Sequence, residues 1–433
     1  MSSTSYQAIV IGAGPAGSSA ALTMARAGLN VALVERGTFP GEKNMFGGIL
    51  HRMTSIEELI PDFWERAPLE RHIAKKGTTF MTGEASFNVQ HETVNFDRAP
   101  YNGYTVFRPR FDKWLAEEAV KAGATLITRS TVDELIYKDG RIAGVSILGR
   151  SGQLLAPVVI AADGVLSFTA QKAGLRRPTF NADQMAVGVK ALIDMPRETI
   201  DERFGLVRDQ GFANEFVGCT GGVRGGGFLY TNYDSVSIGL VFHLASLRTS
   251  GKTPYDLLNE FMEQPQVAKM LRGGRLLEYS AHVIPEGGYD MIPELVGDGI
   301  LVTGDAAALC NATGVNLEGI NLASHSGILA GRTVVEAHER NDFTTKTLNR
   351  YKERLDLSWV MQDLKGFKNA PKMLHINRIY NEYPDLVCSM MEHIYRIDGT
   401  PKMSIPKLVL REVKKKVGLK NAISDAFTAW RAL

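Results

Sequence analysis

The sequence is poor in cysteine and contains no cysteine cluster. Its three cysteines, Cys219, Cys310 and Cys388, are widely separated, and no pair has C-x-x-C spacing. The sequence therefore predicts no cysteine-ligated iron–sulfur or structural zinc site in this chain, and we expect no metal site. Scattered cysteines are also typical of proteins from a reducing compartment.

Long hydrophobic runs and a strong charge of one sign are absent as well. No window holds about 18 uninterrupted apolar residues, which a spanning helix requires. The N-terminal residues include no basic segment followed by a signal-type apolar run. The net charge of +2 provides no strong basic field, so no nucleic-acid partner is expected. We expect a cytoplasmic protein, either soluble or peripheral at the inner face of the cell membrane.

What the chain has is length and one highly informative glycine-rich stretch. Its 433 residues predict two or three domains. Residues 8–11 predict a buried strand, Gly12, Gly14 and Gly17 follow with G-x-G-x-x-G spacing, and residues 18–28 predict a helix. These glycines permit a tight turn, close approach to a pyrophosphate and close helix–strand packing. A second strand, residues 31–34, ends at Glu35, where an acid binds a ribose hydroxyl, so the unit predicts an ADP-containing cofactor.

Two later apolar strands also end in acidic residues. Residues 155–162 lead into Asp163, and residues 299–303 lead into Gly304 and Asp305. Ligands of open α/β folds bind at the carboxyl ends of the strands. We therefore expect Asp163 to accept hydrogen bonds from backbone or sugar, and Asp305 to bind a ribityl or phosphate-side hydroxyl.

The connecting segments carry further candidates. The glycine-rich loop at residues 40–50 is interpreted as a ligand-side loop rather than a plain connector. A helix is expected from residue 110 to 122, and Arg108 just before it is either a cation near the cofactor or a solvated loop end. A later helix is expected from Gly314 to about residue 338. The positive end of its dipole would face any group that lies before its N-terminus.

The second half of the chain has a different character. Residues 187–190 and 235–244 predict strands of an antiparallel sheet, and the glycine-rich segment 219–228 is interpreted as a hairpin. Residues beyond 341 are predicted to be helical. Five apolar residues near the end fall on one helical face, and packing against the body is favoured over a docking surface for a partner or membrane: Ile423, Ala426, Phe427, Trp430 and Leu433.

The G-x-G-x-x-G segment at the N-terminus, called the fingerprint below, is followed by strands that end at Asp163 and Asp305. This order of features resembles that of a flavoprotein superfamily. It comprises aromatic hydroxylases, geranylgeranyl reductases and electron-transfer-flavoprotein (ETF):quinone oxidoreductases. Residues 225–232, 278–290 and 297–321 resemble the FixC-type subunits of the Fix, or electron-bifurcating ETF, complex. The likeness covers nearly the whole chain.

The resemblance implies an α/β fold with FAD as cofactor. A discontinuous Rossmann-like FAD-binding domain of the glutathione-reductase or hydroxylase type would comprise residues 1–75, 105–182 and 291–340. An antiparallel-sheet quinone or substrate domain would comprise residues 76–104 and 183–290. A C-terminal helical region would follow at residues 341–433.

The resemblance also implies site residues. The FAD pyrophosphate, ribose and adenine would contact Gly12, Ala13, Gly14, Pro15, Ala16, Gly17, Glu35, Arg36 and Val132. The phosphate side and the flavin would contact Arg108, Asp163, Gly304, Asp305, Gly47, Gly48, Gly314, Val315 and Asn316. Gly287 and Gly288 would shape a quinone pocket. Tyr279 and His282 are candidates for positioning or protonating the quinone, although both are equally interpretable as ordinary strand residues.

The implied function is flavin-dependent electron transfer within a multi-subunit, bifurcating ETF complex. Electrons would come from an ETF alpha/beta-type heterodimer or a small ferredoxin-like iron–sulfur protein and reduce a quinone. ETF:quinone oxidoreductases carry a cysteine-rich iron–sulfur domain that this sequence lacks, so the resemblance implies a cluster borrowed from a partner. The alternatives are a geranylgeranyl-reductase-like isoprenoid reductase and an NAD(P)H-dependent flavin hydroxylase.

Overall fold

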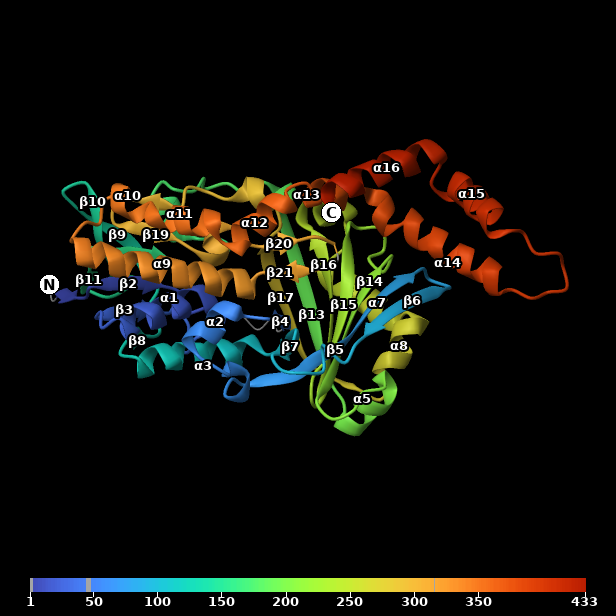
Figure 1. The fold of residues 1–433 in the computed structure, drawn as a ribbon, viewed down its shortest axis with the longest axis horizontal. Coiled ribbons are helices and arrows are strands. Elements are labelled where there is room, and N and C mark those ends of the chain that lie inside the picture. Colours follow the sequence, from blue (N-terminus) through green and yellow to red (C-terminus); the bar gives the residue numbers. More distant parts are fainter. Residues whose placement is uncertain (1–2, 44–47, 315) are drawn as a thin grey trace.

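The computed structural model describes residues 3–43, 48–314 and 316–433 (Figure 1). The predicted α/β fold is confirmed: a mostly parallel sheet, a large mixed sheet and a C-terminal group of helices lie along the molecule. None of the helices in these ranges combines the length and hydropathy needed to cross a bilayer.

The parallel sheet is built around the N-terminal fingerprint. Its strand order is β18-β19-β12-β2-β3-β8, and all neighbours are parallel except β18 and β19. The bounds are β2 (Ala8–Ile11), β3 (Val31–Val34), β8 (Thr125–Ile127), β12 (Val159–Ala161), β18 (Val296–Gly297) and β19 (Ile300–Val302). Strands β2, β3 and β12 are fully buried apolar runs, as expected for a parallel sheet that is covered on both faces.

Helices α1 (Pro15–Arg26) and α3 (Arg108–Lys121) pack on this sheet, and α9 (Ile320–Arg340) packs along α1. A glycine in α9 has a direct role in this packing. A Cβ atom at Gly327 would lie 2.1 Å from the Ala16 carbonyl oxygen, so glycine allows α9 to approach α1 closely. This contact fixes the N-terminus of α1, on which the cofactor site depends.

A small second sheet lies beside the first. Its order is β1-β11-β10-β9, with bounds β1 (Ser3–Ser5), β9 (Val132–Lys138), β10 (Arg141–Ile147) and β11 (Gln153–Leu155). The single strand predicted over residues 155–162 was wrong, because the chain forms β11 and β12 in two different sheets. Pro157 lies between them, and proline cannot donate a backbone hydrogen bond to a ladder.

The large sheet has the order β17-β13-β16-β15-β14-β5-β7-β4, and β6 pairs with β5. Its strands are β4 (Gly48–His51), β5 (Leu69–Met81), β6 (Ser86–Glu92), β7 (Gly103–Val106), β13 (Met185–Asp194), β14 (Gln210–Val217), β15 (Gly225–Thr231), β16 (Ser235–His243) and β17 (Arg275–Pro285). The predicted hairpin over residues 219–228 is confirmed, since β14 and β15 are antiparallel. We expected an antiparallel sheet, but β5 and β14 pair in parallel, so the sheet is mixed. The residue boundaries of the two predicted domains stay a prediction.

Helices cover one end and one face of this sheet (Figure 1). They are α5 (Arg197–Phe204), α6 (Leu244–Ser250), α7 (Pro254–Glu263) and α8 (Pro265–Leu271). Elsewhere, α2 (Thr54–Leu59) contacts α9, and α4 (Phe168–Lys172) contacts β9 of the small sheet. A buried apolar core, including Phe216, Phe242 and Phe261, joins α7 to the strands.

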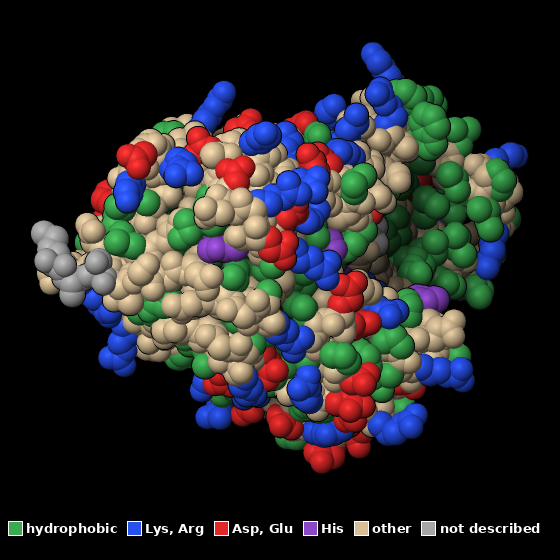
Figure 2. Space-filling view, turned by 60° about the vertical axis from the view of Figure 1, so that its left-hand side comes forward, with side chains coloured by type: hydrophobic (Ala, Val, Ile, Leu, Met, Phe, Trp, Pro, Cys, Tyr) green, Lys and Arg blue, Asp and Glu red, His purple; other side chains and the backbone are tan. Residues whose placement is uncertain are grey.

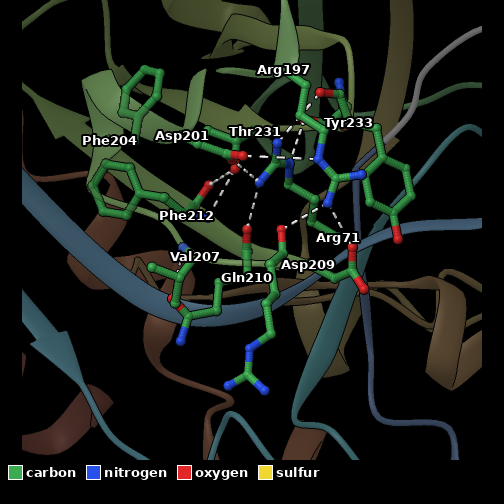
Figure 3. A network of polar contacts seen from close by, with 12 residues as sticks. Arg71, Arg197, Asp201, Phe204, Val207, Asp209, Gln210, Phe212, Thr231 and Tyr233 are labelled. Carbon is green, nitrogen blue, oxygen red and sulfur yellow. Dashed lines mark hydrogen bonds and ion pairs between the residues drawn. The ribbon is translucent and has the colours of Figure 1, made fainter. Parts of the chain in front are cut away.

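The buried Arg71 anchors α5 to the large sheet (Figure 3). Its guanidinium donates to Asp201 Oδ1 at 2.5 Å and to the carbonyls of Gln210 and Asn232 at 3.0 and 2.7 Å. The Arg71 and Arg197 guanidinium groups both lie within 6 Å of the centroid of the Tyr233 ring. One side chain on β5 thus joins helix α5, the start of β14 and the turn after β15.

The C-terminal region is helical, as predicted. Its helices are α10 (Thr345–Leu348), α11 (Arg350–Leu357), α12 (Trp359–Gly366), α13 (Ala370–Leu374), η5 (Asn377–Tyr380), α14 (Glu382–Tyr395), α15 (Ile405–Lys416) and α16 (Leu419–Ala432). The prediction that the apolar face near the end packs on the body was wrong. Ile423, Phe427 and Trp430 are 71%, 56% and 78% exposed, so no residue that the structure describes covers this face of α16.

Candidate functional site

A cavity of about 890 Å³ is lined by residues of the parallel sheet, the large sheet and the C-terminal helices. The three parts meet at the carboxyl ends of β2, β12 and β19, where the topology of the parallel sheet places ligands. On the face drawn in Figure 2, the molecule is hollowed and hydrophobic side chains gather around the hollow. The fold therefore brings the separate sequence motifs to one site.

The turn between β2 and α1 forms one end of the cavity. Gly12 has φ +97°, and a Cβ there would lie 2.4 Å from the carbonyl oxygen of Ala162. A Cβ at Gly17 would lie 1.9 Å from the Gly12 carbonyl oxygen, whereas the space around Gly14 is open. Helix α1 begins at Pro15, three residues earlier than predicted, and Gly14, Pro15 and Ala16 line the cavity. Backbone N–H groups and the positive end of α1 thus face a space that a pyrophosphate fits.

Glu35, at the end of β3, is placed as the sequence predicts. Its Oε2 accepts a hydrogen bond from the Ala13 N–H at 3.1 Å, and its Oε1 accepts one from the Gly37 N–H at 2.6 Å. The carboxylate is held rigidly, lines the cavity and keeps lone pairs for ribose hydroxyls. Arg36 and Val132 line the same end of the cavity.

Arg108 is a buried cation and not a solvated loop end. Helix α3 begins at Arg108, two residues earlier than predicted, because Pro109 fits the first turn of a helix. The guanidinium pairs with both carboxylate oxygens of Asp112 at 2.8 Å, and both residues line the cavity together with Asp305. Burial raises the pKa of Asp305, and the charges of Arg108 and Arg176 oppose that rise. A charged cluster therefore faces the middle of the cavity.

Asp163 lines the cavity, but its side chain is bound within its own loop. Oδ1 accepts from the Ser167 hydroxyl at 2.7 Å and Oδ2 from the Thr169 N–H at 3.0 Å. Gly304 has φ +65°, and a Cβ there would lie 2.7 Å from the Cβ of Ala16. Gly304 thus permits η4 (Gly304–Ala307) to present Asp305 directly beside α1.

The predicted flavin-side residues are only partly described. Gly48, Gly314 and Asn316 line the cavity, and Asn316 Oδ1 accepts a hydrogen bond from Lys76 Nζ at 2.9 Å. Gly47 and Val315 lie outside the described residues. Burial, the larger effect, and the Lys76 charge lower the pKa of nearby His51 to about 4.

The four predicted quinone-site residues are dispersed. His282, on β17, lines the cavity, and burial together with Arg108 and Arg36 lowers its pKa to about 4. Tyr279 is 39% exposed and packs edge-to-face against Tyr255. Gly287 packs against Gln184 and Met291, and Gly288 packs against Pro371. Of these four residues, which all lie in the described ranges, His282 alone lines the cavity.

Several cavity residues were missed by sequence reasoning. The second half of the glycine-rich hairpin, Gly225–Gly227, lines the cavity, as do Glu215, His243 and Glu286. Burial raises the pKa of Glu215 to about 7 against the opposing charge of Lys76. The run of three glycines in a strand was an available signal, because such a strand often marks the close approach of a ligand.

Comparison with known proteins assigns families to three segments. Residues 5–212 match a FAD binding domain, residues 186–284 match "ETF-QO, ubiquinone-binding", and residues 370–433 match the "ETF-QO/FixC family C-terminal domain". The glycine turn, the open space at Gly14 and the held Glu35 fit FAD well.

The chain is also similar to curated proteins along nearly its whole length. The chain is 41% identical to "Protein FixC" of Salmonella typhi over 98% of both chains. It is 40% identical to "Probable electron transfer flavoprotein-quinone oxidoreductase YdiS" of Escherichia coli (strain K12) over 100% of both chains.

Solved structures share the fold at lower identity. A geranylgeranyl bacteriochlorophyll reductase-like protein from Thermoplasma acidophilum has a TM-score of 0.74 at 19% identity, with 99% of this chain and 100% of that chain covered. The flavin-dependent halogenase CmlS has a TM-score of 0.64 at 19% identity, covering 95% and 78%.

Proposed function

The chain belongs to the ETF-QO/FixC family, and we propose that it is the quinone-reducing subunit of a multi-subunit ETF complex. It binds FAD and transfers electrons to quinone. In the proposed complex, the electrons come from an ETF alpha/beta-type heterodimer, from a small ferredoxin-like iron–sulfur protein, or from both. The observation that carries the proposal is the single cavity that joins the dinucleotide turn to the segment matching the ubiquinone-binding family.

In this proposal, the chain's own residues bind and orient the FAD. Gly12 to Gly17 and the N-terminus of α1 would hold the pyrophosphate, and Glu35 would hold the adenosine ribose. Arg108 would lie near the phosphates, and Asp305 would accept a hydrogen bond from a ribityl or phosphate-side hydroxyl. When bound, FAD supplies the redox chemistry by taking up and releasing electrons. No amino-acid nucleophile is required.

The proposed electron donors are separate proteins. The relative named "electron transfer flavoprotein-quinone oxidoreductase" supports an ETF partner for this chain. The three cysteines are all buried and lie apart, and burial raises the thiol pKa of each. They thus resemble structural thiols rather than cluster ligands, which is consistent with a cluster held by a partner.

We also place the protein in the cytoplasm, in peripheral contact with the inner face of the cell membrane. The C-terminal apolar surface, defined here as the exposed side chains of Ile405, Leu410, Ile423, Phe427, Trp430 and Leu433, lies on α15, α16 and the chain end. The basic run Lys414–Lys416 lies at the end of α15. An amphipathic surface with cations beside it favours an anionic bilayer, where quinones reside.

Co-expression tests the proposed partners. The chain is produced with an ETF pair and a ferredoxin-like protein encoded alongside a member of this family, and it is purified through a tag on the chain. We expect the partners to co-purify and the reduced ETF pair to reduce the bound flavin anaerobically. A chain that purifies alone, with a flavin that the ETF pair cannot reduce, contradicts the proposal.

A further inference from the structure

A carboxyl group and an imidazole meet in the cavity wall without a hydrogen-bond partner. Glu286 Oε2 lies 3.6 Å from His243 Nδ1, and the two side chains are 10% and 4% exposed. Among the described residues, neither of these two atoms has a hydrogen-bond partner. Both residues line the cavity. A buried polar group without a partner is costly, so its retention points to a role.

The large sheet brings the two residues together. His243 ends β16 and Glu286 directly follows β17, and both strands pair with β13, which lies between them. Ala186 of β13 is opposite His243 on one side and Ile284 on the other. The Glu286 N–H donates to the Gln184 carbonyl at 2.8 Å, which fixes the backbone after β17. The juxtaposition is therefore a product of strand register.

A second histidine extends the pair toward solvent. The ring of His375, which follows α13, lies 5.3 Å from the ring of His243 in an edge-to-face arrangement. His375 is half-buried, and its Nε2 lies 3.1 Å from the Asp183 carbonyl oxygen. The Asp183 side chain is 51% exposed and pairs with Arg224 at 3.3 Å. Glu286, His243 and His375 thus follow one another from the cavity wall toward the half-buried His375.

We propose that Glu286, His243 and His375 form a path that carries protons from solvent to the cavity during quinone reduction. The inference rests on the proposed function. Reduction of a quinone adds two electrons and two protons, one proton to each carbonyl oxygen, and yields a quinol. The electron-transfer partners supply the electrons, and electrons leaving an iron–sulfur cluster bring no protons. Two protons from water must therefore reach the quinone in the cavity in each turnover.

The chemistry of the three groups suits this task. Burial raises the pKa of Glu286 to about 7, so its carboxyl can both hold and release a proton near neutral pH. Burial, with smaller contributions from His375 and Arg224, lowers the pKa of His243 to about 4. A neutral imidazole accepts a proton at one ring nitrogen and releases one from the other. One water molecule or a ring rotation bridges the distances between the groups.

The surroundings of the path contain few other charges. Facing Glu286 are His243 from β16, Cys310 after η4 and Tyr380 at the end of η5. Facing His243 are His375, Arg224 and Asp183. Burial raises the pKa of both the Cys310 thiol and the Tyr380 phenol, so both stay protonated at neutral pH. Burial raises the pKa of Glu286 to about 7, so its carboxyl is a group of this path that changes charge near neutral pH.

Single-turnover kinetics test the path. The flavin-loaded chain is reduced anaerobically and mixed with a water-soluble ubiquinone analogue, in H₂O and in D₂O. We expect Glu286→Gln to slow quinol formation about 100-fold, within the range of a positioned proton donor. In the unsubstituted protein, the rate should fall as pH rises through about 7, because the protonated Glu286 carboxyl is then lost. The substitution should abolish that dependence and increase the solvent isotope effect.

His375→Ala provides a second variant that lies near the surface. We expect it to slow quinol formation and added imidazole to restore the rate, a response that a structural role would not give. The matched control is His393→Ala, since His393 also contacts a backbone carbonyl, that of Ser389 at 2.8 Å, but lies away from the cavity. This control should keep the rate and the pH profile of the unsubstituted protein.

An infrared difference spectrum gives a readout independent of rate. Deprotonation of Glu286 between pH 6 and 8 should remove a carboxyl C=O band, since its pKa is about 7, and that band should be missing in Glu286→Gln. If the unsubstituted protein reduces quinone but both variants keep its rate, pH profile and isotope effect, the path is wrong and the proposed function stands. If quinone does not reoxidise the reduced flavin of the unsubstituted protein, the proton path and the proposed function are both wrong.

Discussion

At the residue scale, Arg71 shows how one buried charge can hold distant segments together. We predict that Arg71→Ala lowers the free energy of unfolding by about 3–5 kcal/mol, the usual cost of breaking a buried pair. The substitution leaves Asp201 and two backbone carbonyls without their donor. Urea denaturation monitored by fluorescence measures the change.

The matched control for Arg71 is Arg110→Ala. The Arg110 side chain is 66% exposed and pairs with Glu70 at 3.3 Å, so its loss should cost less than about 1 kcal/mol. Equal losses from the two variants would show that the buried network contributes no more than a surface ion pair.

The cofactor turn gives a second prediction at this scale. Gly17→Val should abolish FAD retention, because a Cβ there would lie 1.9 Å from the Gly12 carbonyl oxygen and would displace the turn. The ratio of flavin absorbance to protein after purification measures the effect. Gly366→Ala, where no atom lies within 4 Å of the added Cβ, should retain stoichiometric flavin. A fully loaded Gly17→Val variant would contradict the assigned turn.

Residues of the nucleotide turn were predictable because their signal is local. Gly12, Gly14, Gly17 and Glu35 lie within one short strand–helix–strand unit. His243 and Glu286 were missed because their proximity depends on the register of two strands with β13, and no spacing in the sequence records it. The assignments of Tyr279, Gly287 and Gly288 came from resemblance, and the cavity gives them no support.

At the scale of elements, the C-terminal helix α16 differs most clearly from the prediction, because its apolar face is exposed. Periodicity identified the apolar face of α16, but an exposed face and a packed face have the same periodicity. The same ambiguity does not arise for β2 and β3, whose continuous apolar runs fit only a buried strand in that context.

The C-terminal apolar surface yields a prediction for membrane contact. Phe427→Ser combined with Trp430→Ser should reduce binding to anionic vesicles at least about tenfold, since each removes apolar area that would enter the bilayer. Co-flotation with vesicles of phosphatidylglycerol and phosphatidylcholine measures it. Leu357→Ser, 80% exposed on α11, is the matched control and should bind as the unsubstituted chain does. Undiminished flotation of the double variant would exclude this surface as the contact.

At the scale of the whole molecule, the sequence predicts the architecture but not the cavity. The motifs at Gly12, Asp163 and Asp305 indicated three strands, and β2, β12 and β19 lie side by side as the discontinuous fold requires. The cavity depends on how the large sheet and the C-terminal helices close over those strand ends. That closure results from long-range packing, for which the sequence offers little local signal.

The fold alone does not separate electron transfer from its rivals. The solved structures with similar folds include a geranylgeranyl bacteriochlorophyll reductase-like protein and flavin-dependent halogenases. The family assignment rests instead on full-length relatives at about 40% identity and on the matched C-terminal domain, residues 370–433.

The most direct test of quinone reduction is an anaerobic mixing experiment. The flavin-loaded chain, reduced by its ETF partner, is mixed separately with a ubiquinone analogue and with a geranylgeranyl lipid, and the flavin spectrum is followed. We predict rapid reoxidation of the flavin by the quinone, with stoichiometric quinol, and no reaction with the lipid. A flavin that stays reduced with quinone but is reoxidised by the isoprenoid double bonds would contradict it.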